Sequence, residues 1–106
     1  MSNTFVNAKV DLSTTNVPTL YTCAALTTGI VKSILVSEDS GNADTITLTI
    51  TSGSDVFSLF KTKAVSANAT VELLSAPLVV QASEILKVTA ATANRLHVVA
   101  SILEVT

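Results

Sequence analysis

Residues 45–51 read Thr-Ile-Thr-Leu-Thr-Ile-Thr, and this alternation restricts the fold more than any other feature of the sequence. In an extended strand successive side chains point to opposite faces, so Ile46, Leu48 and Ile50 share one face and the threonines share the other. A helix would spread these apolar residues around its axis and crowd their β-branched side chains. The segment therefore predicts a strand with one apolar face and one threonine face.

Further segments predict strands because they alternate in the same way or form short apolar runs between turn residues. They are residues 4–10, 17–24, 29–37, 55–63, 69–74, 84–91 and 95–105. Pro77 is expected to split the run 74–80 or to place it at a sheet edge, since proline cannot donate a ladder hydrogen bond. About eight short strands predict an all-β fold, an antiparallel β-sandwich that is jelly-roll-like.

Three local alternatives remain open at this stage. Residues 83–87 could begin a helix capped by Ser83, although we expect a strand there. Residues 11–16 could hold a short helical turn. Residues 1–6 could form an extended N-terminal arm or simply the start of the first strand. No repeat or linker divides the sequence, so we expect one domain that covers residues 1–106.

The composition excludes several classes of protein. Apolar residues make up 48% of the 106 residues and the net charge is −2, which argues against disorder. The single cysteine excludes a disulfide within the chain and a cysteine-based zinc site. We expect no membrane span and no secretory signal, because no apolar run approaches about 18 residues and no basic segment precedes one. Six scattered basic residues argue against nucleic-acid binding.

The shortage of charge is itself informative. Charged residues make up 13% of the chain, about half of the usual share, whereas Thr, Val and Ile together account for 36 residues. A free monomer usually needs more surface charge for solubility. Interfaces between permanent subunits are depleted in charge at their centres, so the composition indicates a surface that other subunits cover.

No arrangement of residues predicts catalysis. His97 lies within a strand pattern without a nucleophile elbow, so we expect it at the surface or an interface. Cys23 has no cationic neighbour in sequence and is expected to be a buried thiol. One polar loop could bind a cation or form a solvated turn, but it lacks the EF-hand spacing. Its oxygen-bearing residues are Glu38, Asp39, Asn42 and Asp44. We therefore expect no enzyme, no cofactor and no metal site.

Three segments give the chain a resemblance to small virion structural proteins of tailed bacteriophages of the marine and cyanobacterial type. They are Asn3-Thr-Phe-Val-Asn-Ala-Lys-Val-Asp-Leu-Ser-Thr-Thr15, Leu20-Tyr-Thr-Cys23 and Ala93-Asn-Arg-Leu-His-Val-Val-Ala-Ser-Ile-Leu-Glu-Val-Thr106. The resemblance implies a head decoration (cement) protein or a tail or connector component. It implies no catalytic residues.

We therefore predict a non-enzymatic virion protein that binds the phage major capsid protein or other virion subunits and stabilises the head shell, as a homo-oligomer with a trimer favoured. It would be made in the host cytoplasm, and it needs neither nucleic acid nor membrane. The residues expected at interfaces are Phe5, Thr45, Thr47, Thr49, Lys61, Lys63 and Leu103. The alternatives are a tail, head-tail connector or fibre-base subunit, and a carbohydrate-binding β-sandwich module that would use exposed aromatic side chains. The aromatic residues are Phe5, Tyr21, Phe57 and Phe60.

Overall fold

The computed structural model describes residues 2–106, and within them the chain forms nine strands and no helix. The strands are β1 (Asn3–Asp11), β2 (Thr19–Thr22), β3 (Thr28–Glu38), β4 (Asp44–Ser52), β5 (Asp55–Val65), β6 (Thr70–Glu72), β7 (Leu78–Val80), β8 (Ile85–Ala90) and β9 (Leu96–Val105). All of the strand pairs are antiparallel. The all-β sandwich predicted from the sequence is confirmed.

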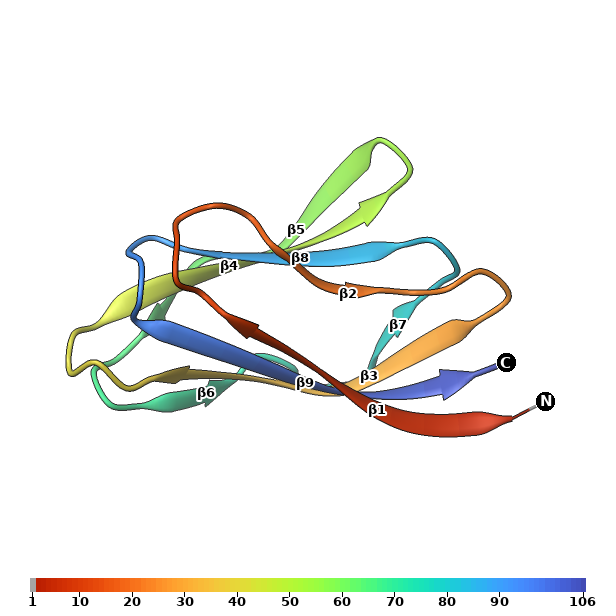
Figure 1. Ribbon diagram of the computed structural model, residues 1–106, viewed down its shortest axis with the longest axis horizontal. Helices are drawn as coiled ribbons and strands as arrows, with labels where there is room; N and C mark the ends of the chain where they lie inside the picture. Colours follow the sequence, from red (N-terminus) through yellow and green to blue (C-terminus); the bar gives the residue numbers. More distant parts are fainter. Residues whose placement is uncertain (1) are drawn as a thin grey trace.

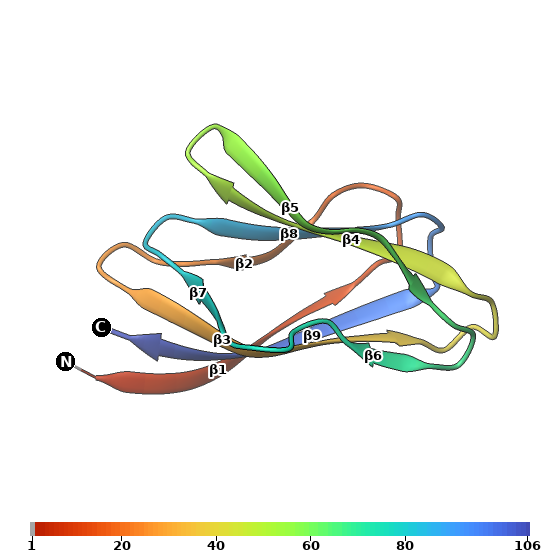
Figure 2. The same ribbon diagram turned by 180° about the vertical axis from the view of Figure 1, so that it is seen from behind.

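The strands form two sheets that lie face to face (Figure 1). Sheet A has the order β1-β9-β3-β6, and the short β7 continues the β6 edge by pairing with the other end of β3. Sheet B has the order β2-β8-β4-β5. Seen from behind, β6 and β7 lie along one edge of their layer, with an irregular segment between them (Figure 2).

The pairing is that of a jelly roll. If β6 and β7 count as one interrupted strand, the chain is a long hairpin whose arms pair in nested order: β4 with β5, β3 with β6 and β7, β2 with β8, and β1 with β9. Rolling this hairpin places alternate pairs in opposite sheets. The β3–β9 and β4–β8 pairings then join the two pairs of each sheet. As a result, the first and last strands lie side by side, as both termini show in Figure 1.

Apolar side chains from both sheets fill the space between the layers. In β4, Ile46 and Leu48 are fully buried, whereas the intervening threonines are half-buried on the opposite face. The same alternation places Val98 and Ala100 of β9 in the core and leaves Val99 exposed. Each central strand therefore has a core face and an outer face, as the sequence alternation predicts.

The structure settles several of the local alternatives. Residues 85–90 are strand β8 and not a helix, and residues 14–16 are bends and not a helical turn. Residues 3–6 do not form a free arm, because they are paired with β9 throughout, and Met1 lies outside the described residues. The run that contains Pro77 is split, with β7 beginning directly after the proline at the sheet edge.

Candidate functional site

The outer face of sheet A, which points away from sheet B, carries a row of apolar side chains across four strands. Phe5 of β1 lies opposite Leu103 of β9, Leu103 lies opposite Ile30 of β3, and Ile30 lies opposite Val79 of β7. Phe5 is 76% exposed and Val79 is 51% exposed, while the two central residues are half-buried by their neighbours. We call these four residues the apolar row. No strand of residues 2–106 covers this face, so its apolar side chains are exposed to water.

Two further rows run parallel to the apolar row. The polar row contains Asn7, Ser101 and Ser33 in register. The mixed row contains Lys9, Val99, Leu35 and Glu72 in register, with the two charged residues at its ends and two exposed apolar residues at its centre. Large apolar side chains thus occupy two of the three rows, separated by small neutral groups.

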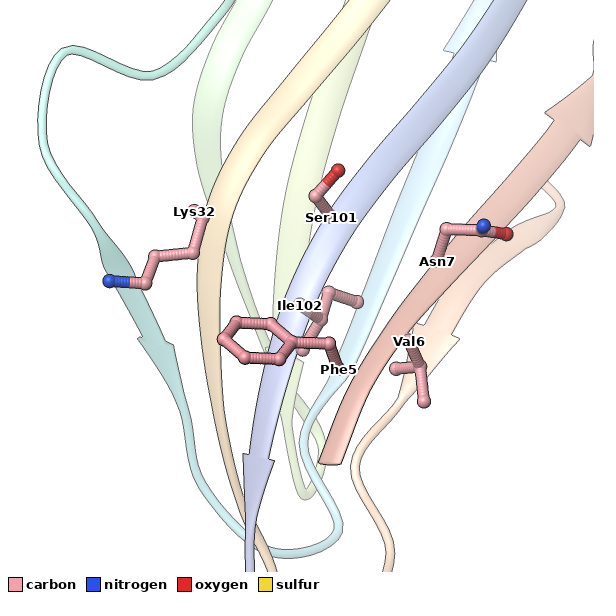
Figure 3. Close-up of a pocket in the computed structure, with 6 residues that line it drawn as sticks. All are labelled: Phe5, Val6, Asn7, Lys32, Ser101 and Ile102. Atoms are coloured by element: carbon pink, nitrogen blue, oxygen red, sulfur yellow. The ribbon is translucent and has the colours of Figure 1, made fainter. Parts of the chain in front are cut away.

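A shallow hollow of about 380 Å³ lies between the apolar row and the polar row. Figure 3 shows the Phe5 ring turned from β1 towards β9, with Ser101 and Lys32 on other sides of the hollow. Lys32 is the extra residue of a β-bulge in β3, since Val31 pairs with Ile102 and Ser33 already pairs with Ser101. The hollow is open and shallow, so it suits contact with another surface.

The acidic end of the mixed row is held in place by hydrogen bonds. The Ser33 hydroxyl donates to the Glu72 carboxylate, the Ile34 amide donates to Glu72 Oε2 at 2.8 Å and the Leu74 amide donates to it at 3.2 Å. The Glu72 carboxylate thereby supplies a hydrogen-bond acceptor to the β3 backbone in the gap between β6 and β7. Burial would raise the pKa of Glu72, but these hydrogen bonds outweigh burial and lower it. The Glu72 carboxylate is therefore ionised and is held in one position at this edge.

His97 lies at the far end of the same outer face. Its Nε2 atom is 3.2 Å from Asp11 Oδ1 and its Nδ1 atom is 3.4 Å from Asp39 Oδ2, and the side chain is 42% exposed. The expectation of a surface histidine is confirmed. The two carboxylates face opposite ring nitrogens across the ends of β1, β3 and β9, so this cluster ties three chain segments together.

A second exposed apolar surface lies on the β4–β5 hairpin, which projects from sheet B (Figure 1). Val56, Phe57 and Leu59 are all exposed, although they lie in one strand and point to both of its faces. Below them, Leu59 and Phe60 line a hollow of about 280 Å³ together with the segment that joins β6 to β7. The hairpin is thus an apolar projection on the edge of the sandwich opposite β2.

One of the threonines of β4 predicted at an interface, Thr47, has a local structural role. Thr45, Thr47 and Thr49 do share the outer face of β4 and are half-buried. The Thr47 hydroxyl accepts a hydrogen bond of 3.0 Å from the Thr62 amide, and Thr62 has a φ of 50°. This hydroxyl therefore supports a bulge in β5.

The prediction that the two lysines of β5 share one strand face is wrong. Phe60 lies opposite Leu48 and Lys63 lies opposite Ile46, so an extra residue stands between them on β5. Lys63 therefore belongs to the face that carries Phe60, whereas Lys61 belongs to the other face. Both lysines are exposed, and they do not form a joint basic patch.

The acidic loop after β3 is solvated at its centre, where Asp39 and Asn42 are exposed, but its two end carboxylates are buried. Glu38 is buried, and its carboxylate accepts hydrogen bonds from the Ser40 hydroxyl and from the amides of Ser40, Gly41 and Asn68. Asp44 is also buried and accepts from the Thr92 amide. These carboxylates therefore order the backbone. In the described part of the chain no three His, Cys, Asp or Glu side chains come together to hold a metal ion.

Cys23 and Tyr21 are buried together near one end of the sandwich. Cys23 is 1% exposed, as predicted, and its thiol donates to the Thr27 carbonyl at 3.3 Å. Tyr21 donates a hydrogen bond of 2.6 Å to Glu104. Burial and this hydrogen bond raise the pKa of Tyr21. Tyr21 is therefore not available as the exposed aromatic platform that the carbohydrate-binding alternative would use.

Comparisons with protein-family models, curated proteins and solved structures found no match to this chain. Within residues 2–106 no helix is long and apolar enough to cross a bilayer. The outer face of sheet A and the β4–β5 hairpin are thus the features of the molecule with the strongest claim to a function.

Proposed function

We propose that the chain is a non-enzymatic structural subunit of a phage virion, and that it decorates and stabilises the head shell. The observation that carries the proposal is the presence of exposed apolar side chains on two separate surfaces, the outer face of sheet A and the β4–β5 hairpin. A subunit of a shell needs one surface for copies of itself and another for the shell, and apolar area is the main source of attachment energy at both.

Two of the three segments that resemble phage structural proteins support this proposal by their position. Residues 3–11 and 96–105 pair along their whole length as β1 and β9. They contribute Phe5 and Leu103 to the apolar row and His97 to the charged end of the same face. These two segments therefore form part of one continuous surface, whereas residues 20–22 of the third segment lie in sheet B.

The hairpin fits contact with the capsid protein. It projects from the sandwich (Figure 1). Its exposed side chains Val56 and Phe57 can enter a depression between capsid subunits. Many copies on a regular lattice turn a modest contact into stable attachment. Neutral threonines on the neighbouring face of β4 can be covered without the desolvation of charge.

The test is the copy number of the chain in purified virions, measured by quantitative gels or mass spectrometry. Hundreds of copies per particle support decoration of the head. A ring stoichiometry of about six or twelve overturns the head location in favour of a tail or connector subunit. Absence from virions overturns the proposal altogether.

A substitution in the β4–β5 hairpin tests the contribution of the hairpin to attachment separately from that of the rest of the surface. Phe57→Ser is expected to reduce binding to heads that lack this protein, because it removes an exposed ring from the hairpin. Leu26→Ser is the matched control, since Leu26 is 93% exposed in a different loop. Equal binding of both variants contradicts a role for the hairpin in attachment.

A further inference from the structure

We propose that a second copy of this chain covers the outer face of sheet A, packed face to face about a two-fold axis that runs parallel to β9 and β3. The proposal goes beyond the virion function, because it concerns the chain in isolation and names the partner of one surface. For the isolated chain it replaces the trimer expected from the sequence with a dimer. It rests on the register of four strands, which places apolar, polar and charged side chains in an order that matches its own two-fold copy.

A two-fold axis between β9 and β3 exchanges these two strands and also exchanges β1 with the β6–β7 edge. Each row of the outer face then meets the same row of the partner, as an isologous interface requires. In the apolar row, Leu103 lies opposite Ile30 of the partner subunit, and Phe5 lies opposite Val79 of the partner subunit. The most exposed ring of the chain is thereby covered by an exposed valine.

The mixed row supplies charge complementarity. Its central residues meet as Val99 against Leu35 of the partner subunit, and its ends meet as Lys9 against Glu72 of the partner subunit. Because the axis repeats each contact, the interface contains two such oppositely charged pairs at its rim. Three hydrogen bonds hold the Glu72 carboxylate beside the outer face, so little entropy is lost when it meets a lysine.

The remaining rows add no repulsion. Ser101 lies opposite Ser33 of the partner subunit, and Lys32, the bulged residue beside Ser33, faces the same neutral part of β9. The Lys32 side chain extends from β3 away from β9 (Figure 3), so the two copies of Lys32 point away from the axis and from each other. At the far end, His97 lies opposite Ser37 of the partner subunit. No like charges are brought together in these rows.

The alternative two-fold axis, perpendicular to the strands, is less favourable. An axis along the polar row would place Lys9 against Phe5 of the partner subunit and Glu72 against Val79 of the partner subunit. Both charges would then lose water without gaining an opposite charge, which is costly.

The size of the face sets the strength of the contact. Four strands about 4.8 Å apart and about nine residues long span roughly 19 by 30 Å, or about 600 Å² per copy. The pair would bury about 1,200 Å², which lies at the lower limit of specific, stable interfaces. We therefore expect a reversible dimer whose population rises with protein concentration.

Sedimentation velocity of the full chain from micromolar to millimolar concentration tests the proposal. The wild type is expected to shift from monomer to dimer. Leu35→Lys places a charge at the centre of the interface and is expected to abolish the dimer, while its exposed position spares the fold. Val56→Lys on the β4–β5 hairpin is the matched control and should dimerise like the wild type. A monomer at all concentrations, a trimer, or a dimer unaffected by Leu35→Lys overturns the proposal.

The proposed contact between Lys9 and Glu72 of the partner subunit tests the orientation of the two copies. Lys9→Glu would face Glu72 of the partner subunit and is expected to weaken association about tenfold, with a larger effect at low salt. Lys61→Glu makes the same change of charge on sheet B and should leave association unchanged. Equal effects of the two substitutions would show that net charge, and not a contact with Glu72, controls association.

Cross-linking gives the geometry directly. With a short bis-maleimide, a mixture of the Phe5→Cys and Val79→Cys proteins is expected to form a covalent heterodimer, and neither protein alone should do so. Two copies of position 5 are separated by about three strand spacings, or roughly 14 Å, across the sheet. Cys23 is buried and does not compete. Efficient linkage of Phe5→Cys to itself would contradict the strand-parallel axis.

The two proposals fail separately. Absence of the chain from virions would leave its concentration-dependent dimer untouched. A chain that stays monomeric in solution but is abundant on heads would retain the virion function and exclude the face-to-face pair.

Discussion

The carboxylate of Glu38 orders two loops at once. It lies at the end of β3 and accepts hydrogen bonds from the loop that follows β3 and from Asn68 in the turn between β5 and β6. Burial would raise the pKa of Glu38, but the hydrogen bonds from Ser40, Asn68 and Gly41 outweigh burial and lower the pKa from 4.5 to about 2. The ionised form is therefore favoured by folding.

This pKa shift predicts a pH dependence of stability. Because the folded pKa lies below the unfolded value, the contribution of Glu38 is fully present above pH 4.5 and is lost as the pH falls towards about 2. Glu38→Gln is expected to be less stable than the wild type at neutral pH, and the difference should shrink through this acidic range. Urea denaturation at several pH values measures it. Asp55→Asn, at an exposed carboxyl group, is the control; a constant difference for Glu38→Gln would contradict the assignment.

Gly29 allows Tyr21 to lie against β3. A Cβ atom at position 29 would lie 3.0 Å from the Tyr21 hydroxyl oxygen and 3.1 Å from its Cε2 atom. The tyrosine cannot easily retreat, since its hydroxyl is bonded to Glu104. We expect Gly29→Ala to lower the free energy of unfolding by about 1–3 kcal/mol, as overpacking does in other cores.

Denaturant titrations test this explanation in two backgrounds. If the tyrosine causes the loss, the cost of Gly29→Ala should largely disappear in a Tyr21→Ala protein. Thr28→Ala, at the exposed neighbouring position, should have little effect. If Gly29→Ala lowers the free energy of unfolding equally in both backgrounds, contact with Tyr21 is not the cause.

At the scale of the element, the connection between β2 and β3 carries a strained residue. Leu26 has a φ of 60° and its side chain is 93% exposed, so it adopts a left-handed conformation without compensating burial. Leu26→Gly is expected to raise the free energy of unfolding by about 0.5–1 kcal/mol, because relief of strain exceeds the added entropy of the unfolded chain. Thermal and urea denaturation measure the change.

Val17→Gly provides the comparison for this prediction. Val17 is also exposed, but its φ is not positive, so glycine there only increases the entropy of the unfolded chain and should reduce stability. A gain in stability at both positions, or a loss at both, would show that strain at Leu26 is not the cause.

The elements themselves could be predicted from sequence where the pattern is local. The alternation of residues 45–51 predicts β4, and Pro77 predicts the break that precedes β7. The bulges at Lys32 and Thr62 could not be predicted, because neither residue type requires a bulge and the partner strand determines its place. The assignment of the two β5 lysines to one face failed for this reason.

The candidate surface was predictable only in part. Phe5 and Leu103 were expected at interfaces, and they do lie in one row, but Ile30 and Val79 were not identified. All four residues come from strands distant in the sequence, and their alignment depends on the register of three strand pairs. No local pattern contains that information. The apolar surface of the hairpin was not identified as an interface, because Phe57 follows the alternation of a core residue yet lies where the hairpin projects.

At the scale of the whole molecule, the nested pairing determines the order in which contacts can form. The β4–β5 pair closes a short turn, whereas the β1–β9 pair joins the two ends of the chain. Closure of a longer loop costs more entropy, and folds dominated by distant pairs fold in about milliseconds to seconds. We therefore expect folding to begin with the β4–β5 pair and to end with β1.

This order predicts opposite kinetic effects of two core truncations. Leu48→Ala in β4 should lower the free energy of unfolding by about 2–5 kcal/mol and mainly slow folding, because its contacts already exist in the transition state. Val10→Ala in β1 should mainly accelerate unfolding, since β1 docks afterwards. Stopped-flow refolding and unfolding in urea separate the two rates. A β1 substitution that slows folding as much as the β4 substitution does would show that the ends of the chain meet early, and the jelly roll would then assemble from its outermost pair inwards.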